Sequence, residues 1–289
     1  MKNKSSIGTR TRVCAVVGNP IAHSLSPAIH NAAYEELKLD FVYVAYRVED
    51  VKSALAGMRA MENFRGMSIT IPHKVEAMKY VDRIGDVDRA IGSINTVVND
   101  NGMLRGFGTD GPGALKSLAD AGVDPDGKNV LMLGAGGAAR MIAFTLANRA
   151  KLNSLSILDI DEQTCQGLTA DLRQRSEIKV VSGMLNKSNL ENAMEKAELV
   201  IHCTPIGMHP DEDASLVPPD LFRPGQVVFD IVYTPLETKL LKDAKARGVK
   251  TVSGVEMFIN QAVLQFEQFT GLDAPVEVMR RKVMERLKS

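Results

Sequence analysis

The chain has 289 residues, and its 35 lysines and arginines balance 35 aspartates and glutamates, so the formal net charge is zero. A hydrophobic share of 45% and a charged share of 24% fit a globular protein and exclude dominant disorder, which needs low hydrophobicity and high net charge. Without a basic excess we expect no broad nucleic-acid surface, and no apolar run is long enough for a membrane span.

Strands and helices alternate from the start of the chain. Apolar or β-branched runs predict strands over 13–17, 41–46 and 67–71. Helical patterns lie between them, over 27–37 and 51–61. Asn101-Gly102 separates the strand-like runs 96–99 and 103–107, which indicates a hairpin with a tight turn. Residues before 13 are expected to form a frayed tail, and residues up to about 110 an α/β unit.

A second unit follows the same rhythm. Apolar runs predict strands over 129–133, 155–158, 179–181, 199–202 and 227–230. Helical patterns separate them, the clearest over 162–175, as in a parallel, doubly wound sheet. From Gly254 the chain reads as helical to about Glu285, and an apolar stripe there should join the core: Met257, Phe258, Phe266 and Phe269.

The glycine-rich segment after the strand 129–133 is the first chemical signal. Gly134, Gly136 and Ala139 fit the G-x-G-x-x-G/A pattern between a strand and a helix. Glycines there let the backbone approach a pyrophosphate, which then lies at the helix N-terminus. We therefore predict dinucleotide binding; a plain tight turn is the alternative.

The end of the next strand carries an acidic residue where a ribose would be bound. Asp159 lies at about the expected spacing from the glycine turn for a carboxylate that bonds the ribose 2′-OH. Such a carboxylate would repel a 2′-phosphate, and no arginine stands beside it, so NAD is favoured over NADP. Alternatively, an aspartate here, such as Asp161, only caps the following helix.

Polar residues at two further places point to a substrate. Ser24 and Ser26 stand at a helix N-terminus, which favours an anion such as a carboxylate, although Ser26 could simply cap the helix. Lys74 follows a strand, and Asp110 stands where the first unit ends. A nearby carboxylate and partial burial would tune the pKa of this lysine for proton transfer. Alternatively, Lys74 is only a solvated charge and Asp110 only part of a turn.

Cysteine and histidine usage limits other chemistry. The three cysteines are far apart, which excludes a disulfide framework and fits a reducing, cytoplasmic environment. The five histidines are dispersed without metal-ligand spacing, so no metal site is expected.

Taken together, these segments resemble the shikimate/quinate dehydrogenase family over nearly the whole chain. The matching motifs stand in the family's order: Gly18-Asn19-Pro20-Ile21, His23-Ser24-Leu25-Ser26-Pro27, Ile69-Thr70-Ile71-Pro72-His73-Lys74, Gly92-Ser93-Ile94-Asn95-Thr96, Thr109-Asp110-Gly111, Gly134-Ala135-Gly136-Gly137-Ala138, Cys203-Thr204-Pro205-Ile206-Gly207-Met208, Asp230 through Thr238, and Gly254 through Met257 with Gln261-Ala262. The resemblance implies an α/β protein of two domains. Residues 1–110 with 254–289 would form the substrate-binding and catalytic domain, and 111–253 a Rossmann-type, doubly wound dinucleotide-binding domain.

The resemblance also implies roles for individual residues. Lys74 and Asp110 would be the catalytic pair. Substrate contacts would come from Ser24 and Ser26 at a carboxylate, from Thr70, Lys74, Asn95, Asp110 and Gln261 at ring hydroxyls, and from Tyr233. Cofactor contacts would come from Gly134, Ala135, Gly136, Gly137, Ala138, Asp159, Thr204, Met208 and Gly254, with Met208, Tyr233 and Gly254 near the nicotinamide.

The implied activity is reversible conversion of shikimate and 3-dehydroshikimate with a nicotinamide cofactor, a step of aromatic amino acid biosynthesis. A lysine ammonium can polarise the carbonyl, so no metal is needed, and a monomer or homodimer is expected. A catabolic enzyme that prefers quinate and a non-catalytic nucleotide-binding sensor are the alternatives.

Three positions depart from the family pattern. Gly108 and Ser68 stand where family members often carry asparagine. Asp159-Ile160-Asp161 stands where NADP-using members carry an Asn-Arg-Thr-like segment. The third departure resembles the NAD-using branch, so NAD is the expected cofactor and NADP the alternative.

Overall fold

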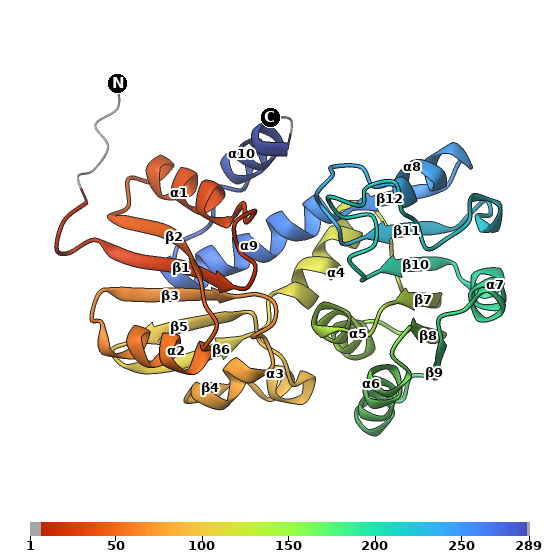
Figure 1. Cartoon of the computed structure of the whole chain (residues 1–289), viewed down its shortest axis with the longest axis horizontal. Coiled ribbons are helices and arrows are strands. Elements are labelled where there is room, and N and C mark those ends of the chain that lie inside the picture. The colour runs from red at the N-terminus through yellow and green to blue at the C-terminus, as the bar shows by residue number, and fades with distance from the viewer. Residues whose placement is uncertain (1–6, 288–289) are drawn as a thin grey trace. The chain divides into compact units, whose positions relative to one another are not determined.

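Figure 1 shows the computed structural model, which describes residues 7–287. The chain forms two compact units. The first holds the described residues up to Thr109 and those from Gln261 onward, and the second is Asp110–Asn260. The expected frayed tail falls partly on residues 1–6, outside the described range.

The second boundary lies inside helix α9 (Gly254–Thr270), not at its start as the domain division from the resemblance had it. The first turns of this helix pack within the second unit. The Phe258 ring stacks on Tyr233, with 4.6 Å between centroids, and Asn260 donates a hydrogen bond to Ser117 at 3.1 Å.

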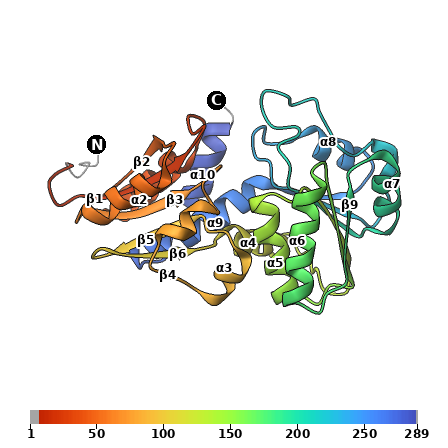
Figure 2. The ribbon, with the colours of Figure 1, turned by 60° about the horizontal axis from the view of Figure 1, so that its bottom comes forward.

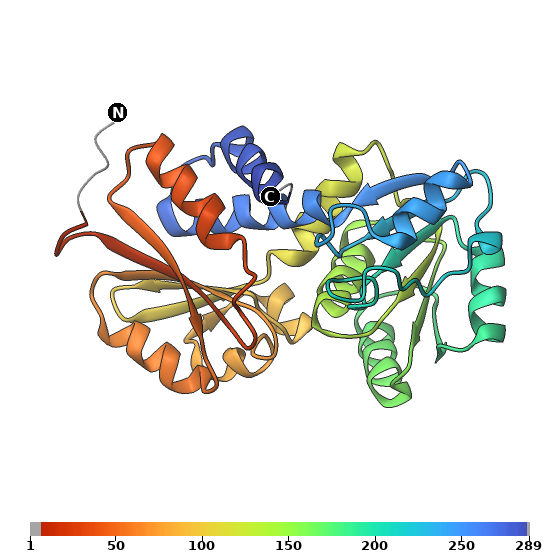
Figure 3. The ribbon, with the colours of Figure 1, turned by 45° about the horizontal axis from the view of Figure 1, so that its top comes forward.

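The first unit is built on a mixed six-stranded sheet. In spatial order its strands are β2 (Phe41–Arg47), β1 (Arg12–Gly18), β3 (Phe64–Ile69), β5 (Thr96–Asp100), β6 (Met103–Phe107) and β4 (Arg83–Ile84). Its helices are α1 (Ser26–Glu36), α2 (Val51–Ala60), the 3₁₀ helix η1 (Glu76–Tyr80), α3 (Asp86–Ile91) and α10 (Val276–Leu287). Helices α1 and α10 lie side by side on one face, and α2 covers the other (Figure 3).

Alternation along the strands explains the two layers. Ala15 and Val17 of β1 point to the α2 face, where Leu55 and Met58 join the same core cluster. The predicted hairpin is confirmed: β5 and β6 pair antiparallel around Asn101 and Gly102. Both turn residues have left-handed φ angles of 54° and 90°, which asparagine and glycine tolerate best.

The second unit is built on a six-stranded sheet in which every pair is parallel. Its strands in spatial order are β12 (Lys250–Ser253), β11 (Val227–Asp230), β10 (Leu199–His202), β7 (Asn129–Leu133), β8 (Ser154–Asp159) and β9 (Val180–Met184). Its helices are α4 (Asp110–Asp120), α5 (Gly137–Arg149), α6 (Glu162–Arg175), α7 (Lys187–Lys196), the 3₁₀ helix η2 (Pro219–Leu221) and α8 (Lys239–Ala246). The predicted doubly wound sheet is thus confirmed.

Both faces of this sheet are covered. Helices α4, α5 and α6 gather on one side and α7 and α8 on the other (Figure 2). Because the strands are buried on both faces, they read as continuous apolar runs, which is why the sequence predicted most of them. The short edge strand β12 and helix α4 were not predicted.

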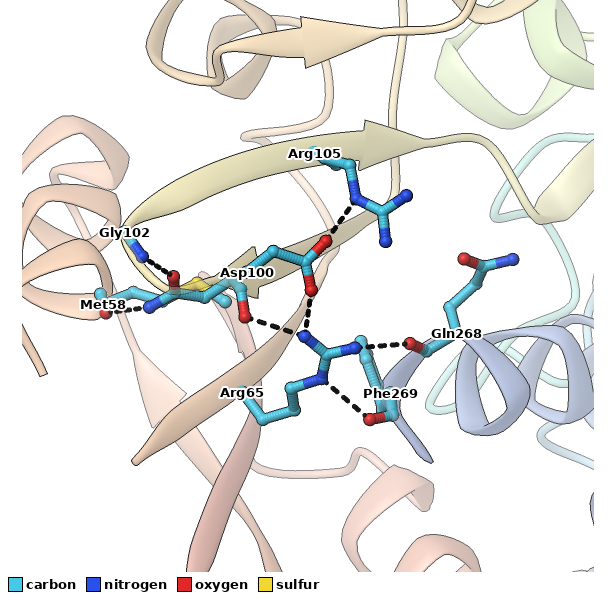
Figure 4. A network of polar contacts seen from close by, with 8 residues as sticks. Met58, Arg65, Asp100, Gly102, Arg105, Gln268 and Phe269 are labelled. Carbon is cyan, nitrogen blue, oxygen red and sulfur yellow. Dashed lines mark hydrogen bonds and ion pairs between the residues drawn. The ribbon is translucent and has the colours of Figure 1, made fainter. Parts of the chain in front are cut away.

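Within the first unit, Arg65 binds the last turn of α9, as Figure 4 shows. Its guanidinium donates to the carbonyl oxygens of Phe269 at 2.9 Å and of Gln268 at 3.5 Å, and it also pairs with Asp100. Carbonyls at a helix C-terminus lack partners within the helix and favour a cation. Partial desolvation opposes ionisation of Asp100, but Arg65 and Arg105 outweigh it and lower the pKa of this carboxyl.

An aromatic cluster under α1 contains a buried histidine. His30 stacks on Tyr43, with 4.3 Å between ring centroids, and lies near Phe266 and Phe269. Neither ring nitrogen has a hydrogen-bond partner among the described residues. Burial therefore lowers the pKa of His30 to about 3.

Replacing this histidine should change how stability depends on pH. Because the folded pKa lies below the unfolded value of about 6.5, the unfolded chain binds a proton that the folded chain excludes, and stability falls as pH drops from 6.5 towards 3. His30→Phe removes that loss, so between pH 6.5 and pH 5 the variant should gain about 2 kcal/mol relative to the unaltered protein. Urea unfolding at both pH values checks this; a difference that stays constant with pH would contradict it.

Candidate functional site

The two serines of the first unit stand at the start of α1. The helix begins at Ser26, and its N-cap residue Leu25 makes no side-chain hydrogen bond. The alternative in which Ser26 caps the helix is therefore wrong. The Ser24 hydroxyl oxygen accepts a long hydrogen bond of 3.4 Å from the Ser26 N–H.

A buried chain of side chains extends from Tyr43 across the sheet. The Tyr43 hydroxyl donates to Ser68 at 2.6 Å, and Ser68 donates to the Gln265 side-chain oxygen at 2.7 Å. The Gln265 amide nitrogen donates to the Asn95 carbonyl at 3.3 Å and to Thr96 at 3.1 Å. Since a carbonyl only accepts, the Gln265 oxygen must face Ser68, and this sets the direction of the whole chain.

Sequence reasoning found neither Tyr43 nor Gln265. Gln265 does lie four residues after the predicted contact Gln261, on the same face of α9, and both are buried. A polar residue that repeats at helical spacing within an apolar stripe was the available signal.

The segment after β3 carries Thr70 and Lys74, both half-buried. Main-chain bonds hold it beside the start of β5, because Ile69 donates to the Asn95 carbonyl at 2.8 Å and Ile94 to the Lys74 carbonyl at 3.0 Å. The structure therefore brings Thr70, Lys74 and Asn95 onto neighbouring segments.

A neighbouring histidine anchors the same segment. The buried His73 ring donates from Nε2 to the Val48 carbonyl at 2.8 Å, a contact that the sequence did not reveal. A carbonyl only accepts, so this contact fixes the proton on Nε2.

Asn95 is held in one orientation by Thr109. Its side-chain oxygen accepts the Thr109 N–H at 2.7 Å, and its amide nitrogen donates to the Thr109 hydroxyl at 3.0 Å. Asp110, the next residue, is buried and begins both α4 and the second unit. Asp110 therefore follows directly on Thr109, which is hydrogen-bonded to Asn95 within the first unit.

The predicted glycine turn, Gly134 to Ala138, joins β7 to α5. Gly134 has a φ of 106°, and a Cβ there would come within 3.0 Å of the Cys203 carbonyl and of the Thr204 methyl. Gly136 is exposed, a Cβ on it would meet nothing within 4 Å, and it precedes α5 without a side-chain cap. The turn therefore leaves open space and helix N–H groups that fit a pyrophosphate.

Asp159 ends β8 and turns its carboxylate to this loop. One oxygen accepts the Ala135 N–H at 2.6 Å, and the other accepts the Asp161 N–H at 2.8 Å. Asp161 caps α6 by accepting from Gln163 and Thr164, so the expected cap is confirmed for that aspartate. Asp159 supports the glycine turn and keeps further lone pairs for a ligand.

The remaining predicted cofactor residues follow β10 and β11. Met208 is exposed. A Cβ on Gly254 would come within 2.5 Å of the Val232 carbonyl, so Gly254 and the Tyr233 segment pack tightly together. Burial raises the pKa of Tyr233. Within residues 7–287 no group of side chains has metal-ligand geometry, and no helix has the length and apolarity to cross a membrane.

The parallel, doubly wound sheet and the glycine turn after β7 define a protein with a Rossmann-type unit. Residues 16–97 match the family model of the shikimate dehydrogenase substrate binding domain, and residues 254–284 match that of the shikimate 5′-dehydrogenase C-terminal domain. A protein of Moorella thermoacetica named shikimate dehydrogenase (NADP+) is 42% identical over 279 residues, covering 96% of this chain and 94% of its own. The chain belongs to the shikimate dehydrogenase family, which confirms the resemblance.

Two solved structures are similar to this chain over nearly its whole length. Shikimate 5-dehydrogenase from Listeria monocytogenes, in complex with shikimate and NAD, has a TM-score of 0.89 at 33% identity and covers 97% of this chain and 99% of its own. Quinate dehydrogenase from Corynebacterium glutamicum, in complex with NAD, has a TM-score of 0.88 at 28% identity and covers 95% and 99%.

The direction of the buried chain can be tested by stability. Ser68→Ala removes the middle member and strands both the Tyr43 hydroxyl and the Gln265 oxygen, which should cost about 2–4 kcal/mol. Tyr43→Phe leaves Ser68 still bonded to Gln265 and should cost only about 1 kcal/mol. Urea unfolding of both variants checks the order; equal losses would contradict it.

Proposed function

We propose that this enzyme interconverts shikimate and 3-dehydroshikimate with a nicotinamide dinucleotide, with NAD preferred. Family membership supports the reaction, and the single observation that carries the substrate side is the placement of Thr70, Lys74 and Asn95 on neighbouring segments of one unit. The unit that ends at Thr109 and resumes at Gln261 would bind substrate, and the unit Asp110–Asn260 would bind the dinucleotide.

Each substrate contact has a chemical reason. Ser24 and Ser26 would donate to the substrate carboxylate at the open N-terminus of α1, whose N–H groups favour an anion. Thr70, Asn95 and Gln261 would bond the ring hydroxyls, with Tyr233 as a further contact. The Asn95 amide is already oriented by Thr109, so little ordering would be needed when substrate binds.

Lys74 and Asp110 would perform the proton transfer. When bound, the nicotinamide would exchange a hydride with C3 of the substrate. In the oxidative direction Lys74 would accept the proton of the C3 hydroxyl, and in reduction its ammonium would polarise the carbonyl and return that proton. Lys74 would enter the oxidative step as the neutral amine, and Asp110 would orient it and stabilise the ammonium that forms when it has taken this proton.

Quinate is the second candidate substrate, because a quinate dehydrogenase is among the structural relatives. Quinate differs by a hydroxyl on C1 beside the carboxylate, where Ser24 and Ser26 would act. We propose a cytoplasmic enzyme, in keeping with three cysteines that form no disulfide, and a monomer or homodimer.

Lys74→Ala should lower kcat with shikimate by roughly 10²–10⁴, the range for loss of a proton-transfer group, and leave dinucleotide affinity unchanged. The matched control is Lys79→Ala, since Lys79 lies on η1 and its ammonium is engaged at 2.6 Å by Glu76 on the surface. Absorbance of the reduced cofactor follows the rate with shikimate and with quinate. Full activity of Lys74→Ala would refute the assigned role, and no turnover of either substrate by the unaltered enzyme would refute the function.

The preference for NAD rests on the end of β8. Asp159 would accept bonds from ribose hydroxyls, whereas a 2′-phosphate would bring like charge against it. At about 4 Å and an effective dielectric near 20, that repulsion is about 4 kcal/mol before solvent screening reduces it. Against this stands the NADP+ in the name of the Moorella relative; the Listeria relative binds NAD. The neighbouring Ile160, 77% exposed, supplies no compensating charge.

The cofactor test is sharpest at Ile160. Asp159→Asn would strand one of two backbone N–H groups, because an amide offers a single oxygen, so that change disturbs the turn itself. Ile160→Arg leaves these bonds intact and should raise kcat/KM for NADP about tenfold, whereas Ile160→Gln, of similar reach without charge, should not. The unaltered enzyme should have the higher kcat/KM with NAD; a higher value with NADP would refute the preference.

A further inference from the structure

A second buried chain of polar groups lies in the dinucleotide-binding unit. His202 ends β10 and Asp230 ends the neighbouring strand β11, and both are buried. His202 Nδ1 lies 2.8 Å from Asp230 Oδ1, and His202 Nε2 lies 2.5 Å from the Thr204 hydroxyl oxygen. The network therefore joins the two loops that leave these strands.

The proton positions in this network follow from its donors. Asp230 already accepts the Val232 N–H at 3.0 Å and the Thr238 hydroxyl at 2.6 Å. A carboxylate with both oxygens accepting requires the histidine to donate, which places a proton on Nδ1 and directs Nε2 to Thr204. Thr238 in turn accepts the Leu241 N–H as the N-cap of α8, so the anchor of the network is itself held by a helix.

Thr204 stands where a dinucleotide would pass. Strand order changes direction along the chain between β7 and β10, and ligands of such sheets bind outside the carboxyl ends of the strands at this point. The Thr204 methyl is one of the groups that a Cβ on Gly134 would meet, so this side chain borders the glycine turn. Its hydroxyl oxygen also accepts the Ile206 N–H at 3.3 Å.

We infer that His202 and Asp230 are positioning residues for the dinucleotide and act through the Thr204 hydroxyl. The inference rests on the proposed function in that a dinucleotide occupies the glycine turn. His202 holds the Thr204 oxygen in one place, Asp230 fixes the tautomer and tilt of the ring, and the hydroxyl meets the ligand already ordered. Nothing in this role requires His202 to touch the ligand.

A role that is only structural makes a different prediction. If the pair merely stabilises the sheet, replacing His202 would lower stability, and its effect on ligand affinity would not depend on Thr204. If it acts through Thr204, its effect on affinity must vanish once the Thr204 hydroxyl is gone.

A double-mutant cycle distinguishes the two roles. The dissociation constant of NADH, measured by the fluorescence of the bound nucleotide, should rise about tenfold in His202→Phe, as for loss of one well-placed hydrogen bond. Thr204→Val should show a similar rise, and the double variant no further rise. In a Thr204→Ser background, which keeps the hydroxyl, His202→Phe should again weaken binding about tenfold. Additive effects in the Val cycle would overturn the inference.

His30, a buried histidine of the first unit, is the matched control. His30→Phe makes the same substitution in the first unit, where the histidine ring has no hydrogen-bond partner among the described residues, and it should leave NADH affinity unchanged. If the unaltered protein binds no NADH, the proposed function fails; if it binds NADH and His202→Phe binds equally well, only this inference fails.

A measurement on the unaltered protein covers the case in which His202→Phe does not fold. The ¹⁵N signals of the His202 ring should show the Nδ1 proton, and the Nε2 signal should shift when NADH is added while the His30 signals stay in place. The inference would be overturned by a His202 ring without a proton on Nδ1, or by an Nε2 signal that does not shift when NADH is added.

Discussion

The close approach of the backbone at Gly134 to the residues that follow β10 is the constraint on which the second unit depends. A side chain at 134 would strike the Cys203 carbonyl and the Thr204 methyl, and φ at this position is left-handed. The approach brings the loops after β7, β8 and β10 together: Asp159 bonds the Ala135 N–H, and Thr204 borders the turn. Through His202 and Asp230 the same contact reaches the loop after β11. One glycine therefore allows the convergence of loops that a ligand site needs.

In the first unit, the side-chain amide of Gln265 connects separate segments in a similar way. Gln265 must direct its nitrogen to the Asn95 carbonyl, and this orients Ser68 and Tyr43 in turn. Buried polar groups are stable only when bonded, and a chain with one direction leaves little freedom for alternative arrangements. The Arg65 contacts hold the end of α9, the helix that carries Gln265, so the polar chain begins from a fixed point.

Most of the fold could be predicted from the sequence because local signals were strong. Strands β7, β10 and β11 are apolar runs, and Asn101-Gly102 predicts the hairpin of β5 and β6. Helix α4 was not predicted because Thr109-Asp110-Gly111 is typical of a turn. Strand β12 was not predicted because its four residues contain no apolar run. The glycine turn and the Asp161 cap follow from local patterns, whereas the contacts of Gln265 and His202 join distant segments. Such pairings depend on strand order, which residue spacing does not encode.

Two of the buried histidines, His30 and His202, show where sequence reasoning ends. In the sequence His30 and His202 are both isolated, and neither has ligand spacing. The structure places His30 among aromatic rings, where burial lowers its pKa, and His202 between a carboxylate and a hydroxyl, where each ring nitrogen has a partner. A histidine without hydrogen-bond partners contributes only the packing of its ring, which another aromatic ring can supply. A histidine with a hydrogen-bond partner on each nitrogen fixes the position of one partner relative to the other. A binding site needs side chains that are held in place in this way.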